Sequence, residues 1–255
     1  MEALVGIIRY TFKQHTRSKI FLAIILFGLI LILGGLVVSS IALDERMRFL
    51  LDIGLAGIEF LALVTVIYAT VNLVLEEMES RTIYLILAHP IKRSHYIVGR
   101  YIGTLLSVVV GMAAMAILHV IGLYLIGWHW QFFYLVAVGL SVLKIMVMSA
   151  LALFFSLFST SAAASMVFTI FVWLLGHFSE ELRYVGERSN IVLVKLVVWV
   201  LYHLTPNLAY FNYRDFWASA TQPPLTWFVW IVLYSAAYIG SCLYIAHFLF
   251  SQKEF

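Results

Sequence analysis

The sequence predicts an all-α integral membrane protein with six transmembrane helices in a single domain, residues 1–255. Hydrophobic residues make up 64% of the chain and charged residues only 11%, whereas roughly a quarter of the residues in a soluble domain are charged. The mean hydropathy is +1.01. Six segments are long and apolar enough to cross the hydrocarbon core, which takes about 20 helical residues. Because no linker-like run rich in Pro, Gly or Ser separates them, we expect one transmembrane domain.

The N-terminal segment 1–19 has the pattern of an amphipathic helix. Its apolar face recurs at helical spacing, at Leu4, Ile7, Ile8, Thr11 and Phe12. Such a helix is expected to lie on the membrane surface, and a solvated basic tail is the alternative. The apolar run that follows has 22 residues, which is longer than the roughly 7–15 residues of a signal-peptide core. We therefore expect an uncleaved first span.

One long insertion interrupts the series of predicted spans. The six spans are expected at residues 20–41, 53–75, 101–127, 133–158, 162–178 and 227–250. A partly apolar insertion, residues 179–226, separates the last two. Its middle, "NIVLVKLVVWVLYHL", has 15 residues and is about a turn or more too short for a crossing. We expect a re-entrant or interfacial helix there, with a seventh span as the alternative.

The distribution of basic residues favours both termini in the cytoplasm. With six spans, residues 1–19, the loop 76–100 and the C-terminal tail share one side and carry nine Lys and Arg, against six on the other side. Cytoplasmic segments are enriched in these residues. The insertion 179–226 is then extracytoplasmic. We expect a multi-pass plasma membrane protein, in a bacterium the inner membrane.

Two charged residues lie inside predicted spans, Glu59 in the second and Lys144 in the fourth. At 1.5 Å per residue their depths differ by about 7 Å, which two long side chains can bridge. His119, in the third span, is expected at a depth similar to that of Glu59. Buried ionisable groups are costly in a membrane and usually face the bundle interior. The three residues either line a substrate path or gate, or form a structural polar lock.

Several function classes find no support in the sequence. Cys242 is the single cysteine, so one chain offers neither an intrachain disulfide nor a Cys-based metal site. The eight histidines are scattered, and no metal site is expected. The strings H-E-x-x-H and G-x-S-x-G of membrane proteases are absent, as is the nucleotide-binding G-x-x-x-x-G-K-[ST]. The small net charge of +3 gives no reason to expect a nucleic-acid partner.

The loop 76–100 is charged where a span would be apolar. It consists of an acidic part, "EEMES", a short apolar part, "RTIYLILAHP", and a basic part, "IKRSHYIVGR". The apolar part is too short to cross the membrane, and Pro90 is expected to end its helix. This helix either lies parallel to the membrane or docks into a protein groove. In the simplest alternative, the charges only set the topology.

The order of residues in this loop resembles the type-2 ABC transporter permeases. Their second and third spans are joined by the patterns E-x-E-x-x-T, L-L-x-x-P-[VIL]-[ST]-R and [GK]-[KR]-x-[LIV]-[GA]. The matching positions are Glu77, Glu79, Arg81, Thr82, Leu85, Leu87, Pro90, Ile91, Arg93, Gly99, Arg100 and Gly103. Two details depart from the pattern: Lys92 stands where the family often has Ser or Thr, and Arg81 and Thr82 replace the usual small or glycine residue before the threonine.

The resemblance extends over essentially the whole chain. Six spans, an amphipathic N-terminal helix and a long insertion before the last span are all features of this family. Within it, "TPNLAYFNYRDF" at residues 205–216 is similar to a short motif of the group that includes the nitrous-oxide-reductase copper-maturation permease.

The resemblance implies the permease subunit of an ATP-driven ABC transporter of the exporter type. The loop 76–100 would hold a coupling helix that contacts a soluble cytoplasmic ABC ATPase. The residues that would make this contact are Glu76, Glu77, Glu79, Arg81, Thr82, Ile83, Leu87, Pro90, Lys92 and Arg93. ATP and Mg would bind to the ATPase dimer, and this chain would be neither an enzyme nor the carrier of a cofactor.

Further partners and two other functions follow as expectations. Such transporters use twelve spans, which implies a second permease copy in a homodimer, or a similar permease in a heterodimer. One alternative is a mechanotransmitter that acts on an extracytoplasmic protein without solute flux. The other is an ion-coupled secondary transporter that uses Glu59 and Lys144.

Overall fold

The computed structural model describes nine separate stretches of the chain, and all their regular structure is helical. These stretches are residues 2–18, 25–26, 28–30, 33–35, 37, 46–80, 93–159, 161–216 and 223–252. Five helices are long and apolar enough to cross a membrane, and one bent pair of helices would make a sixth span. The predicted all-α class is therefore confirmed, and the chain is a multi-pass membrane protein. The first predicted span, residues 20–41, lies largely outside the described residues.

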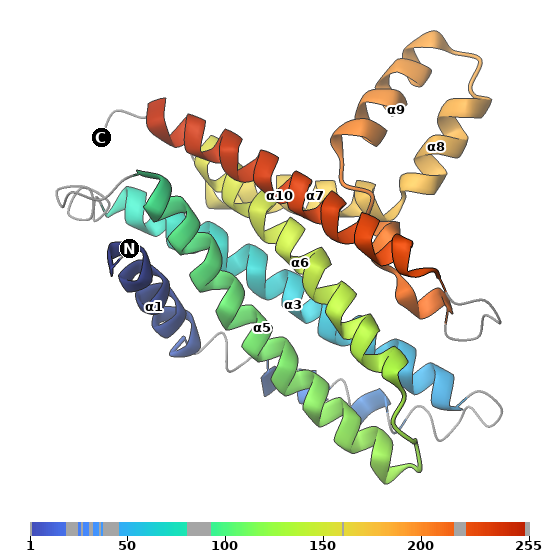
Figure 1. The fold of residues 1–255 in the computed structure, drawn as a ribbon. Coiled ribbons are helices and arrows are strands. Elements are labelled where there is room, and N and C mark those ends of the chain that lie inside the picture. The colour runs from blue at the N-terminus through green and yellow to red at the C-terminus, as the bar shows by residue number, and fades with distance from the viewer. Residues whose placement is uncertain are drawn as a thin grey trace.

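Four long helices run side by side and form the body of the molecule (Figure 1). They are α3 (Arg46–Glu79), α5 (Arg93–Leu125), α6 (Phe132–Phe158) and α10 (Leu225–Gln252). Helix α6 is central, because it packs against the other three and also against α7. Its small side chains Ser149, Ala150 and Ala152 are fully buried, which lets neighbouring helices approach closely.

Two of these helices extend beyond the predicted spans. Helix α3 begins seven residues before 53 and ends four residues after 75, and α5 begins eight residues before 101. The predicted spans count only the apolar stretch that crosses hydrocarbon, whereas a helix continues until a residue breaks it. Helix α5 accordingly begins at Arg93, three residues after Pro90.

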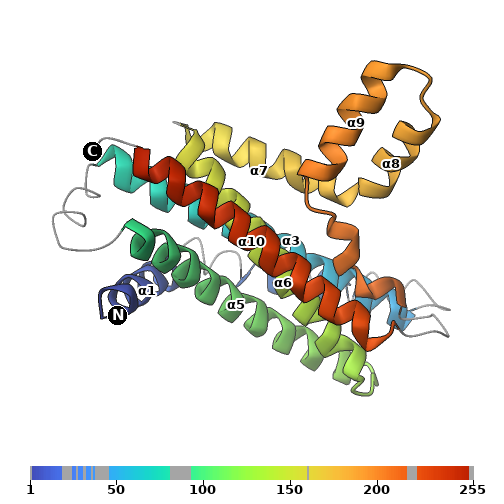
Figure 2. The ribbon, with the colours of Figure 1, turned by 45° about the horizontal axis from the view of Figure 1, so that its top comes forward.

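The predicted N-terminal helix is present as α1 (Glu2–Thr16) and packs along α5 (Figures 1 and 2). Two glycines of α5 allow this close contact. A Cβ atom added to Gly99 would lie 2.7 Å from the side chain of Ile7, and one added to Gly103 would lie 2.6 Å from that of Thr11. Small residues four positions apart are a common solution for helix contacts in membranes.

The insertion forms a helical hairpin followed by a return to the bundle. Helix α7 (Ala162–His177) is followed by α8 (Ser179–Arg188), which is bent from it by 68°. Helix α8 packs against α9 (Val192–Leu204), and this pair projects away from the other helices (Figures 1 and 2). Two short 3-10 helices, η1 (Leu208–Phe211) and η2 (Tyr213–Phe216), then lead back to α6.

The length of α9 bears on whether it crosses the membrane. Its 13 residues span about 20 Å at 1.5 Å per residue, which is less than the roughly 30 Å of hydrocarbon. Only together with η1 does it reach the 20 residues of a candidate span. The stretch from α9 through η1 is one of the five candidate spans counted above, so the non-spanning helix and the seventh span both stay predictions.

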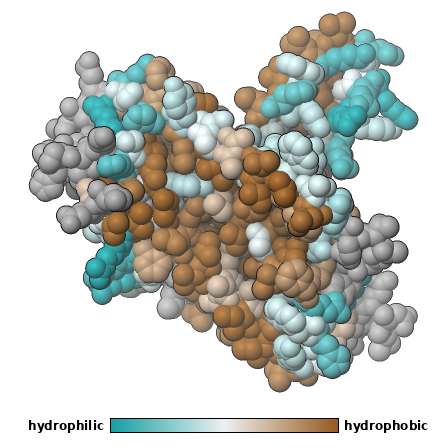
Figure 3. Space-filling view, viewed as in Figure 1, coloured by the Kyte–Doolittle hydropathy of each residue, from teal (hydrophilic) through white to brown (hydrophobic). Residues whose placement is uncertain are grey.

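The visible surface of the bundle is apolar across its middle (Figure 3). Large apolar side chains of the described helices are exposed, including Ile117, Leu135, Val167, Trp230 and Tyr244. Hydrophilic side chains gather on the hairpin and near the ends of the bundle. Apolar patches of this extent mark contact with lipid or protein, as expected for spans in a bilayer.

Candidate functional site

The predicted coupling loop is described at its two ends only. Its centre, residues 81–92, lies outside the described residues and contains Arg81, Thr82, Ile83, Leu87, Pro90 and Lys92. Helix α3 ends at Glu79 and α5 begins at Arg93, and α1 and the end of α10 lie beside them (Figure 1). We call this part of the bundle the loop end.

A buried ion pair joins α3 to α5 at the loop end. The guanidinium of Arg100 donates to the carboxylate of Glu77, and the two residues are only 2% and 8% exposed. The hydroxyl of Tyr96 donates to the second carboxylate oxygen at 2.6 Å. Glu77 therefore faces the interior, whereas Glu76 and Glu79 are exposed. The three predicted glutamates thus fall into one buried ion-pair residue and two surface residues.

Arg100 also joins α1 to this pair. Its guanidinium donates to the hydroxyl of Thr11 at 2.7 Å. It lies over the rings of Tyr10 and Tyr96, at 5.4 and 5.5 Å from their centroids, within the ~6 Å of a cation–π contact. One side chain thus contacts both neighbouring helices. Arg100 matches the family pattern in the sequence, but the pattern predicts no contact for it.

Arg93 joins α5 to the end of α10. Its guanidinium donates to the carbonyl oxygens of Phe250 and Ser251 at 3.0 and 2.7 Å. The last carbonyls of a helix have no partner within the helix, so a cation at this position satisfies them. The rings of Phe250 and Tyr96 stack at 5.2 Å. Arg93, a predicted ATPase contact, thus also holds α10 in place.

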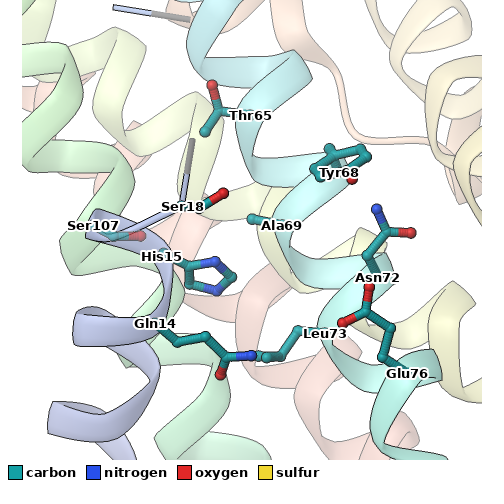
Figure 4. A pocket seen from close by; sticks show the side chains of 10 residues that line it. All are labelled: Gln14, His15, Ser18, Thr65, Tyr68, Ala69, Asn72, Leu73, Glu76 and Ser107. Atoms are coloured by element: carbon teal, nitrogen blue, oxygen red, sulfur yellow. The ribbon is translucent and has the colours of Figure 1, made fainter. Parts of the chain in front are cut away.

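A small polar cavity of about 160 Å³ lies next to the loop end, between α1, α3 and α5 (Figure 4). Gln14 and His15 of α1 face Asn72 and Glu76 of α3 across it. The Nε2 atom of His15 lies 3.2 Å from the hydroxyl of Thr104. Burial and the positive charge of Arg100 lower the pKa of His15 to about 4. His15 is therefore uncharged at neutral pH.

A second buried site lies near the middle of the bundle. Lys144 of α6 contacts one carboxylate oxygen of Glu59 at 2.6 Å, and Arg214 of η2 contacts the other at 3.1 Å. We call these three residues, together with the polar side chains of Ser141, His177 and Asn212 that contact them, the ion cluster. Glu59 and Lys144 are 8% and 1% exposed. The predicted proximity of Glu59 and Lys144 is confirmed, and Arg214 is an addition from a distant part of the chain.

Three polar side chains complete the ion cluster. The hydroxyl of Ser141 donates to Glu59 at 3.2 Å. The Lys144 ammonium lies 3.3 Å from Nε2 of His177 and 3.4 Å from Oδ1 of Asn212. An ammonium group can donate hydrogen bonds but cannot accept them, so Nε2 of His177 accepts the hydrogen bond from Lys144.

The cluster thus connects α3 and α6 with the end of α7 and with the segment around η2. The sequence carried one signal for its additional members, since Asn212 and Arg214 lie in the quoted "TPNLAYFNYRDF" motif. No such signal marked His177.

His119 lies apart from the ion cluster, in a contact of its own. Its Nδ1 atom is 3.0 Å from the hydroxyl of Tyr134, and its Nε2 atom is 3.2 Å from the carbonyl oxygen of Leu50. Both ring nitrogens therefore have partners. A Cβ atom on Gly54 would collide with this ring, so the imidazole packs tightly against α3. This position is that of a satisfied core histidine.

The chemistry available at the two sites is charge pairing. Within the described stretches, no three His, Cys, Asp or Glu side chains are grouped so as to hold a metal ion. Buried ion pairs contribute strongly to the relative placement of helices, because removing one partner leaves the other charge buried alone. Both sites lie where several helices meet.

Comparison with known proteins gives one match. A family model described as "ABC-2 family transporter protein" matches residues 5–237. The matched range includes the ion cluster and the parts of the loop end that α1, α3 and α5 contribute, but not the end of α10. No curated protein matches the chain.

Proposed function

This chain belongs to the ABC-2 transporter family, and from that premise we propose that it is the permease subunit of an ATP-driven ABC transporter of the exporter type. A separate cytoplasmic ABC ATPase dimer binds ATP and Mg and hydrolyses the ATP. The permease itself has no G-x-x-x-x-G-K-[ST] sequence with which to cradle phosphates. Its task is to convert the closure of the ATPase into a rearrangement of the spans.

The observation that carries this proposal is the way the coupling loop is anchored. The two ends of the loop continue directly into α3 and α5. Arg100 joins these helices to each other and to α1, and Arg93 joins α5 to α10. A force applied to the loop is therefore passed to four helices at once. If the helix ends were not anchored to their neighbours, the same force would move only the loop and would not reach the other helices.

The surface residues of the loop end suit an ATPase contact. Glu76 and Glu79 are exposed at the end of α3, where carboxylates can make charge-assisted hydrogen bonds with a basic partner. The predicted contacts Arg81, Thr82, Ile83, Leu87, Pro90 and Lys92 follow between the two described ends. Because α1 and the end of α10 both lie at the loop end (Figure 1), a cytoplasmic loop end is in keeping with two cytoplasmic termini.

The ion cluster is proposed to act as a lock on the outer half of the permease. Glu59 holds Arg214, and hence η2, against α3 while it also binds Lys144 of α6. Irregular backbone at membrane depth is tolerated only where protein buries it or where it lines a cavity. Releasing η2 would therefore open a path at this position. Glu59 and Lys144 then serve as gate residues, and His119 serves as part of the rigid core.

The second candidate function is a mechanotransmitter that acts on an extracytoplasmic protein. The projecting hairpin of α8 and α9 favours it, because a structure that stands away from the bundle is accessible to a partner (Figures 1 and 2). The same ATPase would drive both functions. An ion-coupled secondary transporter is less favoured, since the Glu59 carboxylate is held by two cations.

The proposal is tested by purifying the tagged chain from its native membrane and identifying its partners. We expect a soluble ABC ATPase to co-purify, together with a second permease copy. Reconstitution of this complex in liposomes should give ATP-dependent flux for a transporter, and ATP hydrolysis without flux for a mechanotransmitter. Ion-driven flux by the chain alone, with no ATPase bound, would contradict the assignment.

A further inference from the structure

An apolar cavity lies between α6, α7, α9 and α10. Its volume is about 510 Å³, within the roughly 300–1,000 Å³ that is usual for ligand sites. Aromatic rings dominate its wall, from Phe154, Phe155, Phe158, Phe168 and Phe171. We propose that this cavity binds an acyl chain of a membrane phospholipid. The inference rests on the fold and stands independently of the proposed transport function.

The polar side chains in the wall show that the occupant is apolar. The hydroxyls of Thr205, Ser241 and Tyr238 all donate to backbone carbonyl oxygens, at 2.7, 2.9 and 3.0 Å respectively. The other polar side chain in the wall is the thiol of Cys242, a weak donor. The other eleven residues of the wall are apolar, so the wall offers a bound water few of the two to four polar partners that it requires. A hydrocarbon chain requires none.

The position of the cavity identifies the source of that chain. Helices α6 and α10 are candidate spans, and α7 belongs to the bent pair that can form another. The cavity is thus lined by helices that are embedded in hydrocarbon, where lipid chains are the surrounding solvent. An α-helix of a second copy is about 10–12 Å across, so about one turn would already fill the space. A single acyl chain is narrower and can lie along the phenylalanine wall.

The hairpin forms one edge of the cavity. Leu201 and Leu204, at the end of α9, line it, and the hydroxyl of Tyr238 on α10 donates to the carbonyl oxygen of Leu204. An occupant therefore contacts the base of α9 and the two spans α7 and α10. The bound chain would support the hairpin in the position that the structure shows.

Photolabelling in lipid nanodiscs tests this proposal. The protein is reconstituted with phosphatidylcholine that carries a diazirine on one acyl chain, irradiated and mapped by peptide mass spectrometry. The filling variant Val172→Trp places bulk in the cavity. Its control, Val167→Trp, lies on the same helix at a position that is 63% exposed and outside the wall. A second pair on α10 is Ile245→Trp in the wall and Val232→Trp outside it.

We expect adducts on the cavity-facing residues of α7 and α10 in the wild-type protein. Each filling variant should reduce them at least about ten-fold, equivalent to ~1.4 kcal/mol, and each control should leave them unchanged. Matching elution volumes and melting temperatures establish that the variants are folded. Equal labelling of filling variants and controls would overturn the proposal. So would a wild-type cavity without adducts in which Cys242 cross-links to Cys242 of a second copy.

Discussion

Glu59 joins two cations near the middle of the bundle. Its two carboxylate oxygens contact Lys144 and Arg214, and the Lys144 side chain is only 1% exposed. Burying a charge without its partner is strongly unfavourable, whereas replacing both partners of a buried pair is often tolerated. The stability of the protein should therefore respond differently to single and double substitutions here.

We predict that Glu59→Gln lowers the free energy of unfolding by roughly 3–5 kcal/mol, because Lys144 is left without its carboxylate. The double variant Glu59→Gln/Lys144→Met should regain much of this loss. Thermal unfolding in detergent measures both changes. The matched control is Glu187→Gln, which removes the exposed ion pair with Arg183 and should change stability by less than about 1 kcal/mol. Equal effects of Glu59→Gln and Glu187→Gln would contradict the buried lock.

We predict that His15 makes stability depend on pH. Its pKa is about 4 in the folded protein and about 6.5 in an unfolded chain, so the unfolded state binds the proton more readily. The contribution of neutral His15 to the free energy of unfolding is therefore fully present above pH ~6.5, and it is lost as the pH falls toward 4. The melting temperature of the wild type should drop more than that of His15→Gln between about pH 7 and pH 5.

The control for this measurement is His203→Gln, at an exposed position on α9. It should follow the wild-type curve. If the melting curves of His15→Gln and the wild type stay parallel over this pH range, the buried neutral state of His15 is refuted.

At the scale of elements, the contact between α1 and α5 depends on two glycines. We predict that Gly103→Ala destabilises the protein by roughly 1–3 kcal/mol, because overpacking forces helices apart. The new Cβ would lie 2.6 Å from Thr11 and 2.9 Å from the carbonyl oxygen of Ile8. Gly139→Ala, in open space on α6, should instead stabilise by about 0.5–1 kcal/mol. Melting temperatures that shift in the same direction would show that α1 does not pack here.

The end of α10 depends on Arg93. We predict that Arg93→Gln speeds deuterium exchange in the last turn of α10, since the hydrogen bonds to Phe250 and Ser251 are lost. Hydrogen bonds from charged groups contribute about 1.5–3 kcal/mol, so exchange should accelerate by roughly ten- to hundred-fold. Arg188→Gln, at the last turn of α8, should leave α10 unchanged. If deuterium exchange in α10 were unchanged in Arg93→Gln, the contact between Arg93 and the end of α10 would be refuted.

The long helices could be predicted from the sequence because a membrane crossing needs a continuous apolar run. The proximity of Glu59 and Lys144 was also predictable, since depth along a helix follows from residue counting. Arg214 and His177 were not, because their contacts arise when the chain returns to the bundle after the hairpin. The buried role of Glu77 was equally hidden, since it requires Tyr96 and Arg100 of the next helix.

At the scale of the whole molecule, we propose that one charged site receives the movement of the ATPase and that the other acts as a lock. The loop end joins α1, α3, α5 and α10, and the ion cluster joins α3, α6, α7 and η2. Helix α3 takes part in both, since Glu59 and Glu77 are 18 residues apart on it. A movement of α3 is therefore the simplest way for the loop end to act on the ion cluster, which lies about 27 Å away along the helix.

The central claim is that an ABC ATPase drives the spans through the loop end. The most direct measurement is ATP hydrolysis by the reconstituted complex, compared between Glu79→Lys and Glu187→Lys. Both replace an exposed glutamate, one at the loop end and one on the hairpin. We predict that Glu79→Lys lowers permease-dependent hydrolysis and transport by about ten-fold or more, because it would place like charges together in the proposed contact between Glu79 and a basic side chain of the ATPase, at a cost of over ~1.4 kcal/mol. Glu187→Lys should retain both activities. Full hydrolysis and full transport by Glu79→Lys would contradict the account.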